Sequence, residues 1–524
     1  MPSFNSTSST LAEIAVATAV VVGSTFALRS FYKQCSNRRR MGNFPSSSPW
    51  YLPLDLYHAF KAGNLEQFVK NRIKALGTTN FYVHFLGITR QPTLCITKPE
   101  DQAELMRKEG KLKFIVDMPD TALETHGAGS IQVISGQRHN FLRKIFASLL
   151  SPAALESFTP YFFGAFNKMW GELEEECRSN DGAPVVIQDA ICKAQFFLMA
   201  KILYGMTPEN TSMEIILQMR DDFEAQLEGH FAPPTSETFK KAKAASKRIH
   251  KIMSEKFNAV LEARRAACNV EEGGEEKKEN ERDDADTRPI GNAMESVADA
   301  LLRHGVDKDP QILSDVYDNL NLLLEASHGT TMTVTTSTLY YLNHPDNTKK
   351  LSCLRQEMKA FDTAPSLANL KGNMPVAEGA IKETMRLAPI IGSVTYVLKD
   401  PVAFTFKGQK MQGPLSFMIA SAHNYSNPEL FPDPDAFIPE RWMEGSEHAV
   451  SKEAKLVYKP FGMGRHMCLG NQLALLVMKS SLYCFAREET RAIEFDTEKV
   501  SRKSGLFPAY YISEGFPGRV IRNA

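Results

Sequence analysis

The strongest chemical signal in the chain is Cys468, which lies in a glycine-rich segment reading FGMGRHMCLG over residues 461–470. A cysteine binds metal as its thiolate, so its surroundings have to lower the pKa of the thiol. Gly464 and Gly470 allow tight turns in which backbone N–H groups point at the sulfur. A helix expected to begin near Gly470 would place its positive dipole end there as well. This pattern suits a shielded thiolate, of the kind that binds haem iron and favours O–O cleavage.

Two neighbouring side chains have expected roles beside this cysteine. Phe461 can pack over the sulfur and exclude water, and the N–H of His466 can reach a haem propionate. From the residues alone, the alternative is a structural cysteine buried in a Gly-rich turn. The segment resembles the cysteine-loop signature of cytochromes P450, Phe-x-x-Gly-x-(Arg/His)-x-Cys-x-Gly, at every fixed position. This resemblance implies that Cys468 is the axial ligand to the iron of haem b, iron protoporphyrin IX.

Two further segments resemble that family in the same order along the chain. Glu383 and Arg386 lie in IKETMRLAP, where their spacing puts them on one face of a helix. Arg441 lies in the segment PDAFIPERW. An isolated Glu-x-x-Arg pair is usually an exposed ion pair of little energetic value. The resemblance instead implies that these three residues are structural and hold the core behind the haem.

The segment GQRHNFLRK, residues 136–144, resembles the family helix that contacts the haem propionates. Arg143 is expected to pair with a propionate through charge-assisted hydrogen bonds. His139 stands where the family often has tryptophan, and its ring can donate a hydrogen bond in the same way. The alternative for His139 is a partly exposed helix residue without a role in cofactor binding.

A long helix is predicted from Asp309 and Pro310, a capping residue followed by proline, to about residue 343, where His344-Pro345 ends it. Its middle, residues 326–331, contains weak helix formers and predicts a local distortion. The resemblance assigns to Thr330 the alcohol that assists proton delivery to dioxygen. The family usually has an acid just before this threonine, whereas this chain has Gly329. We therefore expect Thr330 to work with water, together with His328 or Glu325.

The sequence patterns around these residues predict a mainly α-helical protein with small β-sheets. Most of residues 135–265 and a last helix near 470–487 read as helices, residues 82–99 read as a hairpin, and short strands follow residue 395. Residues 42–54 are rich in Pro and Ser and predict a hinge, and the charged residues 271–288 predict a disordered insertion. Together with the resemblance, this gives a cytochrome P450 catalytic domain over residues 55–524.

The first 41 residues predict a membrane anchor. An apolar run over about residues 11–28 is followed by Arg29, Lys33 and a group of arginines at 38–40. Basic residues after the span place the body in the cytosol, so we expect a single-pass protein of the endoplasmic reticulum membrane. A cleaved presequence, including a plastid-type one, is the alternative.

The resemblance implies a monooxygenase that hydroxylates a lipophilic, isoprenoid- or sterol-like substrate with dioxygen. Electrons would come from NADPH through a separate flavoprotein reductase, with cytochrome b5 as a further candidate partner, because the chain shows no nucleotide-binding fingerprint. Lys plus Arg and Asp plus Glu are equal at 61 each, which argues against a nucleic-acid partner. One alternative is an isomerase or dehydratase acting on a hydroperoxide or endoperoxide. Another is a non-catalytic, membrane-anchored haem sensor.

Overall fold

The computed structural model describes residues 44–45, 65–83, 93–230, 232–272, 291–504 and 510–522. The α-helices are α3 (Leu65–Leu76), α4 (Pro99–Met106), α5 (Glu109–Leu112), α6 (Asp120–His126), α7 (Gly136–Ala147), α8 (Pro152–Ser179), α9 (Ile187–Tyr204), α10 (Met213–Gly229), α11 (Glu237–Glu272), α12 (Ala293–Arg303), α13 (Pro310–Asn343), α14 (Thr348–Lys359), α15 (Leu367–Gly372), α16 (Pro375–Leu387), α17 (Lys452–Val457) and α18 (Asn471–Ala486).

The strands are β1 (Asn80–Val83), β2 (Thr93–Ile96), β3 (Ile115–Val116), β4 (Val185–Val186), β5 (Val394–Leu398), β6 (Ala403–Phe406), β7 (Gln409–Gln412), β8 (Leu415–Ile419), β9 (Arg491–Glu494), β10 (Arg502–Ser504), β11 (Tyr510–Ile512) and β12 (Pro517–Arg522). Short 3-10 turns occur at Ser148–Leu150, Pro345–Asn347, Ala422–Asn424, Pro439–Trp442 and Ser513–Gly515. The prediction of a mainly helical chain with small sheets is therefore confirmed.

The chain divides into two compact units, and the smaller one contains residues up to 117 together with 395–420. Its sheet has the strand order β1-β2-β8-β5-β3. Strands β1 and β2 pair antiparallel, as the predicted hairpin requires, and β2 pairs parallel with β8, with Leu94 opposite Phe417. Phe114 packs against Phe417 with ring centroids 5.4 Å apart, so apolar side chains of distant segments form the core of this unit.

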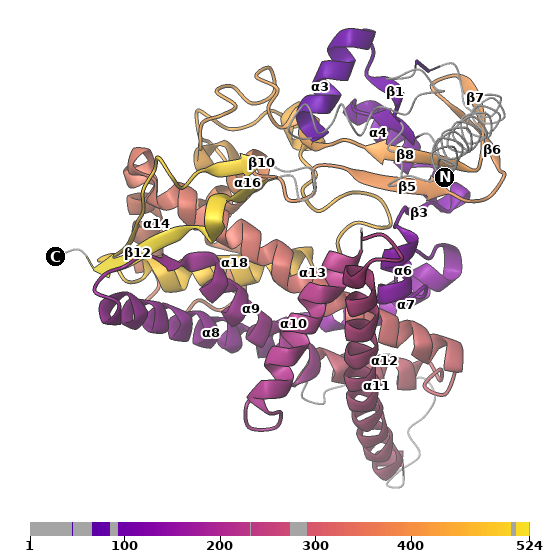
Figure 1. Cartoon of the computed structure of the whole chain (residues 1–524), viewed down its shortest axis with the longest axis horizontal. Coiled ribbons are helices and arrows are strands. Elements are labelled where there is room, and N and C mark those ends of the chain that lie inside the picture. The colour runs from indigo at the N-terminus through magenta and orange to yellow at the C-terminus, as the bar shows by residue number, and fades with distance from the viewer. Residues whose placement is uncertain are drawn as a thin grey trace, which may run out of the picture. The chain divides into compact units, whose positions relative to one another are not determined.

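The larger unit contains residues 118–394 and 421–524 and holds every residue that we predicted to act in the site. Its main core gathers apolar side chains from α8, α9, α13, α16 and α18, around large residues such as Trp170 and Phe485, whose rings lie 5.0 Å apart. Helix α13 packs against α9, α16 and α18, and Figure 1 shows it running through the larger unit. It is the long helix that the sequence predicted from Pro310 to about residue 343.

The ends of α13 follow from its sequence. The Asp309 side chain accepts hydrogen bonds from the backbone N–H groups of Gln311 (2.9 Å) and Ile312 (3.1 Å), which have no partner inside the helix. The helix ends at Asn343, directly before His344-Pro345. The predicted central distortion was wrong, since residues 326–331 continue as regular α-helix. Packing on several sides of α13 outweighs the low helix propensity of these residues.

Among the residues that the structure describes, no helix is long and apolar enough to cross a membrane. Helix α9 carries Asp189, Lys193 and Lys201, and the uncharged second half of α13 is rich in threonine. The prediction of a single-pass protein of the endoplasmic reticulum membrane, with its body facing the cytosol, was therefore wrong. The predicted span at 11–28 and the charged insertion from residue 273 onward lie outside the described residues, as does the hinge apart from residues 44–45.

Candidate functional site

The loop before α18 holds Cys468 in a fixed backbone conformation. The Cys468 N–H donates to the Phe461 carbonyl oxygen at 2.9 Å, and the Met467 N–H donates to the Gly464 carbonyl oxygen at 3.3 Å. Gly464 has φ +73°, a conformation that strongly favours glycine. These bonds close the loop. Cys468 directly follows a turn and stands three residues before Asn471, where α18 begins.

The glycines of the loop differ from the prediction in one respect. Gly470 has φ −84°, and no atom lies within 4 Å of the position that a Cβ would take, so its backbone does not require glycine. A second positive φ in the loop, +77°, occurs at Gly462, which was not singled out from the sequence. The signal that would have found it is the Gly-x-Gly pattern, because closely spaced glycines mark a tight turn. Phe461 is partly buried and packs against the main core.

Cys468 is an exposed residue, yet protein atoms surround its sulfur closely enough for desolvation to matter. Burial raises the pKa of the Cys468 thiol, and the Gly470 amide and the Arg143 charge oppose the rise. The predicted contribution of a backbone amide is thus present, and the charge that also lowers the pKa comes from Arg143, which was expected to pair with a propionate. The prediction that the surroundings lower the pKa of the thiol overall was wrong for the chain without haem, because desolvation outweighs both effects.

Helix α7 places two predicted residues, His139 and Arg143, against the cysteine loop, which contains a third, His466. Arg143 donates from Nη2 to the Met467 carbonyl oxygen at 2.7 Å, one residue before the cysteine. The rings of His139 and His466 lie 4.4 Å apart between centroids, and Nε2 of His466 lies 3.1 Å from the Ile134 carbonyl oxygen. His139 is only 1% exposed, so the alternative of a partly exposed helix residue was wrong.

Glu383 and Arg386 form a buried network with Arg441. Arg386 binds both carboxylate oxygens of Glu383, at 2.8 and 3.0 Å, and Arg441 donates from Nε to the same carboxylate at 3.1 Å. Trp442 donates its indole N–H at 3.0 Å. All three charged side chains are at most 2% exposed. The remaining guanidinium N–H groups donate to backbone carbonyls of residues 425–436, so this network ties α16 to that segment.

Thr330 lies on an exposed position of α13, where its hydroxyl donates to the Ala326 carbonyl oxygen at 2.9 Å. Among the described residues, and apart from its own helical turn, no atom lies within 4 Å of the position that a Cβ would take on Gly329. The space around position 329 would therefore accommodate the acidic side chain that the family usually has there. The side chain of His328 lies outside what the structure describes.

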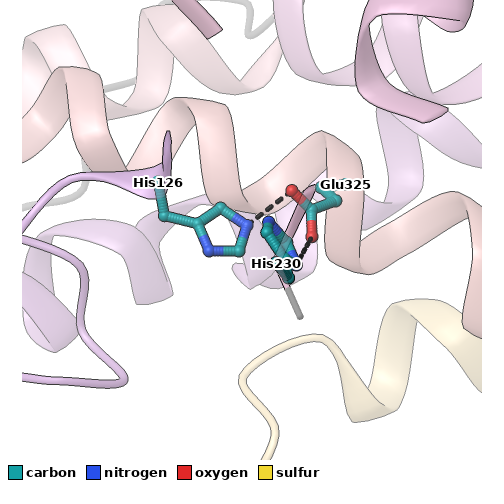
Figure 2. Close-up of side chains that lie close together, drawn as sticks. All are labelled: His126, His230 and Glu325. Carbon is teal, nitrogen blue, oxygen red and sulfur yellow. Dashed lines mark hydrogen bonds and ion pairs between the residues drawn. The ribbon is translucent and has the colours of Figure 1, made fainter. Parts of the chain in front are cut away.

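A second polar cluster surrounds Glu325, five residues before Thr330 on α13. His126, from the end of α6, lies 2.5 Å from its carboxylate (Figure 2). Gln226 of α10 donates a hydrogen bond to the same carboxylate at 2.8 Å. Burial raises the pKa of Glu325. A larger effect in the opposite direction comes from His126, His230 and the Gln226 amide, so the pKa of Glu325 is lowered overall. An ionised carboxylate held in this way is a poor proton donor, which argues against the suggested role of Glu325 in the relay. Neither histidine could be assigned to this cluster from the sequence, because their segments are far apart in the chain.

The comparisons with known proteins agree with this arrangement. The model of the family described as Cytochrome P450 matches residues 46–488. Cytochrome P450 26A1 of Xenopus laevis is 24% identical over 413 residues, which cover 76% of this chain and 75% of that protein. The abscisic acid 8'-hydroxylase CYP707A1 of Solanum lycopersicum is 25% identical over 425 residues, covering 78% and 77%.

A solved structure is similar as well. The retinoic acid-bound cyanobacterial CYP120A1 superposes with a TM-score of 0.68 at 18% identity, covering 92% of this chain and 99% of that one. This similarity confirms the predicted fold. Membership of an enzyme family also favours the predicted monooxygenase over the alternative of a non-catalytic haem sensor. The chain belongs to the cytochrome P450 family, and it is an oxidoreductase of the monooxygenase type that uses haem.

Proposed function

We propose that this P450 uses haem held by Cys468 to hydroxylate a lipophilic, isoprenoid-derived substrate. The observation that carries the proposal is the position of Cys468. Its thiol remains accessible while its backbone is fixed by the Phe461 carbonyl and its sulfur accepts a hydrogen bond from the Gly470 amide. An accessible thiol in a fixed loop is what an axial ligand requires, because the sulfur has to reach the metal without rearrangement of the backbone.

The surrounding residues suit the rest of the cofactor. The two propionates of haem b are anionic and accept hydrogen bonds, and Arg143, His139 and His466 are donors gathered beside the loop. We infer that Arg143 and the two histidines bind the propionates. We assign to Glu383, Arg386 and Arg441 the structural role of fixing the segment that leads to the loop. When bound, haem with a thiolate ligand supplies the activation of dioxygen.

The role that we propose for Thr330 is to hold a water that delivers protons. Its hydroxyl proton is engaged with the Ala326 carbonyl, but the oxygen keeps lone pairs that can accept a hydrogen bond from water. Because Gly329 offers no side chain, that water has to carry the proton that an acid would otherwise supply. Phe461, which is partly buried against the main core, would limit access of water to the sulfur.

Two relatives support the substrate class by their names, one as an abscisic acid 8'-hydroxylase and one as a retinoic acid-bound P450. We extend this to the present chain as a proposal for isoprenoid-derived substrates. Electrons would be supplied from NADPH by a separate flavoprotein reductase, with cytochrome b5 as a second candidate donor.

The second candidate function is isomerisation or dehydration of a hydroperoxide or endoperoxide, and Gly329 favours it. Such chemistry starts from an O–O bond already present in the substrate and requires no proton relay to dioxygen. The test is turnover of retinoic acid or abscisic acid under oxygen-18 gas with a reductase and NADPH. Incorporation of one labelled atom into the product supports the monooxygenase. Reductase-independent conversion of a hydroperoxide, without label, would support the second candidate.

A further inference from the structure

Three side chains from separate segments converge beside the middle of α13, five residues before Thr330. His126 ends α6, His230 directly follows α10, and Glu325 lies on α13. Figure 2 shows the two imidazole rings reaching different oxygens of the Glu325 carboxylate. His126 Nε2 lies 2.5 Å from Oε2, and His230 Nδ1 lies 3.7 Å from Oε1. One nitrogen or oxygen atom from each residue falls within 4.8 Å of the other two.

This cluster is buried and does not contain a lysine or arginine. The side chains of His126, His230 and Glu325 are 6%, 4% and 8% exposed. Within the described part of the chain, the ion-pair partners of Glu325 are these two histidines. A separation of 3.7 Å is too long for a hydrogen bond, and Nε2 of His230 is buried without a hydrogen-bond partner. A buried imidazole nitrogen without a partner is costly and indicates that a ligand is missing from the cluster.

We propose that His126, His230 and Glu325 bind one zinc ion, with water as the fourth ligand. Two imidazoles and one carboxylate form a donor set that zinc uses in proteins when three ligands come from the chain. Zinc bonds of roughly 2.0–2.1 Å place tetrahedral ligand atoms about 3.3 Å apart. One donor atom of each residue lies within 4.8 Å of the other two, and His126 Nε2 lies 2.5 Å from Glu325 Oε2, so small side-chain movements suffice.

The residues around the cluster fit this assignment. Gln226 donates to Glu325 Oε2 at 2.8 Å and lies near Asn321, whose side-chain amide donates to the Thr125 carbonyl at 3.3 Å. Such outer partners orient the ligands and increase metal affinity. Calcium and magnesium prefer oxygen ligands, so this donor set selects against them.

Zinc at this position would join three segments of the larger unit. His126 and His230 are already close through their rings, whose centroids lie 4.2 Å apart, and the Thr121 hydroxyl donates to the His230 carbonyl oxygen. A metal that binds the folded chain and not the unfolded one stabilises it by mass action. The consequence is a zinc-dependent increase in the melting temperature.

The first test measures zinc and iron by mass spectrometry in the full-length protein after treatment with a weak chelator and equilibrium dialysis against Zn²⁺. We expect one zinc per chain that excess Mg²⁺ and Ca²⁺ do not displace. Glu325→Gln and His230→Ala should abolish it, and Gln226→Ala should weaken binding about 10- to 100-fold. His448→Ala, at an exposed histidine, is the matched control and should leave binding unchanged. Absence of zinc from the wild type, or its retention in Glu325→Gln, would overturn the proposal.

X-ray absorption at the zinc edge tests the site in the wild-type protein, without relying on the folding of any variant. We expect nitrogen and oxygen ligands at about 2.0–2.1 Å with imidazole scattering. A sulfur shell at about 2.3 Å would place the zinc on a cysteine and refute the assignment. Both measurements detect zinc rather than iron, so their outcome is independent of the proposed oxygen chemistry.

Discussion

The backbone N–H of Cys468 donates to the carbonyl oxygen of Phe461, seven residues earlier, at 2.9 Å. This bond closes the loop that separates α17 from α18 and fixes where the sulfur stands. Gly464, at φ +73°, allows the chain to turn within the loop. The position of the thiol is therefore set by the backbone, and the residues around it supply the charge and the hydrogen bonds.

The buried carboxylate of Glu383 gives the first prediction. Glu383→Gln keeps the shape but removes the charge shared by Arg386 and Arg441, leaving two buried cations without a counter-ion. Removing one partner from a buried ion pair costs about 3–5 kcal/mol, so we expect a marked fall in the urea midpoint and little haem incorporation. Glu429→Gln, at an exposed glutamate, should change stability by less than about 0.5 kcal/mol. Equal midpoints for the two variants would contradict the structural role.

Arg143 gives the second prediction. Arg143→Ala removes the bond to the Met467 carbonyl and the proposed propionate partner, so haem should leave the protein faster. Loss of a charged hydrogen bond of about 1.5–3 kcal/mol corresponds to a roughly 10- to 100-fold faster release. The measurement is transfer of haem to excess apomyoglobin, with Lys144→Ala at the exposed neighbouring position as control. If both variants release haem at the wild-type rate, Arg143 does not bind a propionate.

Thr330 gives the third prediction. Thr330→Ala removes the hydroxyl that we propose holds the proton-delivering water, so electrons should be diverted into hydrogen peroxide. The product formed per NADPH should fall by on the order of tenfold or more, since positioned proton transfer is worth about 10²–10⁴ in rate. Thr333→Ala is a matched control, because Thr333 makes the same hydroxyl-to-carbonyl bond at 2.9 Å, to Gly329. Unchanged coupling in Thr330→Ala would remove the relay role.

Gly329 gives the fourth prediction. Gly329→Asp restores the acid at a position where a Cβ meets no protein atom within 4 Å, and replacing glycine within a helix does not strain the backbone. We expect the variant to fold and to form more product per NADPH than the wild type. Gly329→Asn has the same size without the acid and should not improve coupling. A gain in the Asn variant equal to that in the Asp variant would show that proton supply is not the cause.

The sequence predicted the turn before Cys468 and the start of α13 better than the electrostatics of the thiol. The spacing around Cys468 and the cap at Asp309 are local patterns, and local patterns determine turns and helix ends. The net pKa of the thiol depends on how closely distant segments surround it, which spacing does not report. The regular helix through 326–331 likewise depends on packing from other helices, which outweighed its weak propensity.

The cluster at Glu325 was beyond prediction for the same reason. Its members come from α6, the end of α10 and α13, and no motif connects residues so far apart in the chain. The antiparallel pairing of β1 with β2 could be predicted, whereas the parallel pairing of β2 with β8 joins strands separated by most of the sequence. Long-range contacts of this kind are visible only in the folded chain.

The most direct test of the central claim is the carbon monoxide difference spectrum of the reduced protein, wild type and Cys468→Ala. A thiolate bound to haem iron shifts the Soret band of the carbon monoxide adduct to longer wavelength. We predict this shifted band in the wild type and its loss in Cys468→Ala, with Cys353→Ala, at an exposed cysteine, as the unchanged control. A shifted band that persists in Cys468→Ala would show that another residue binds the iron.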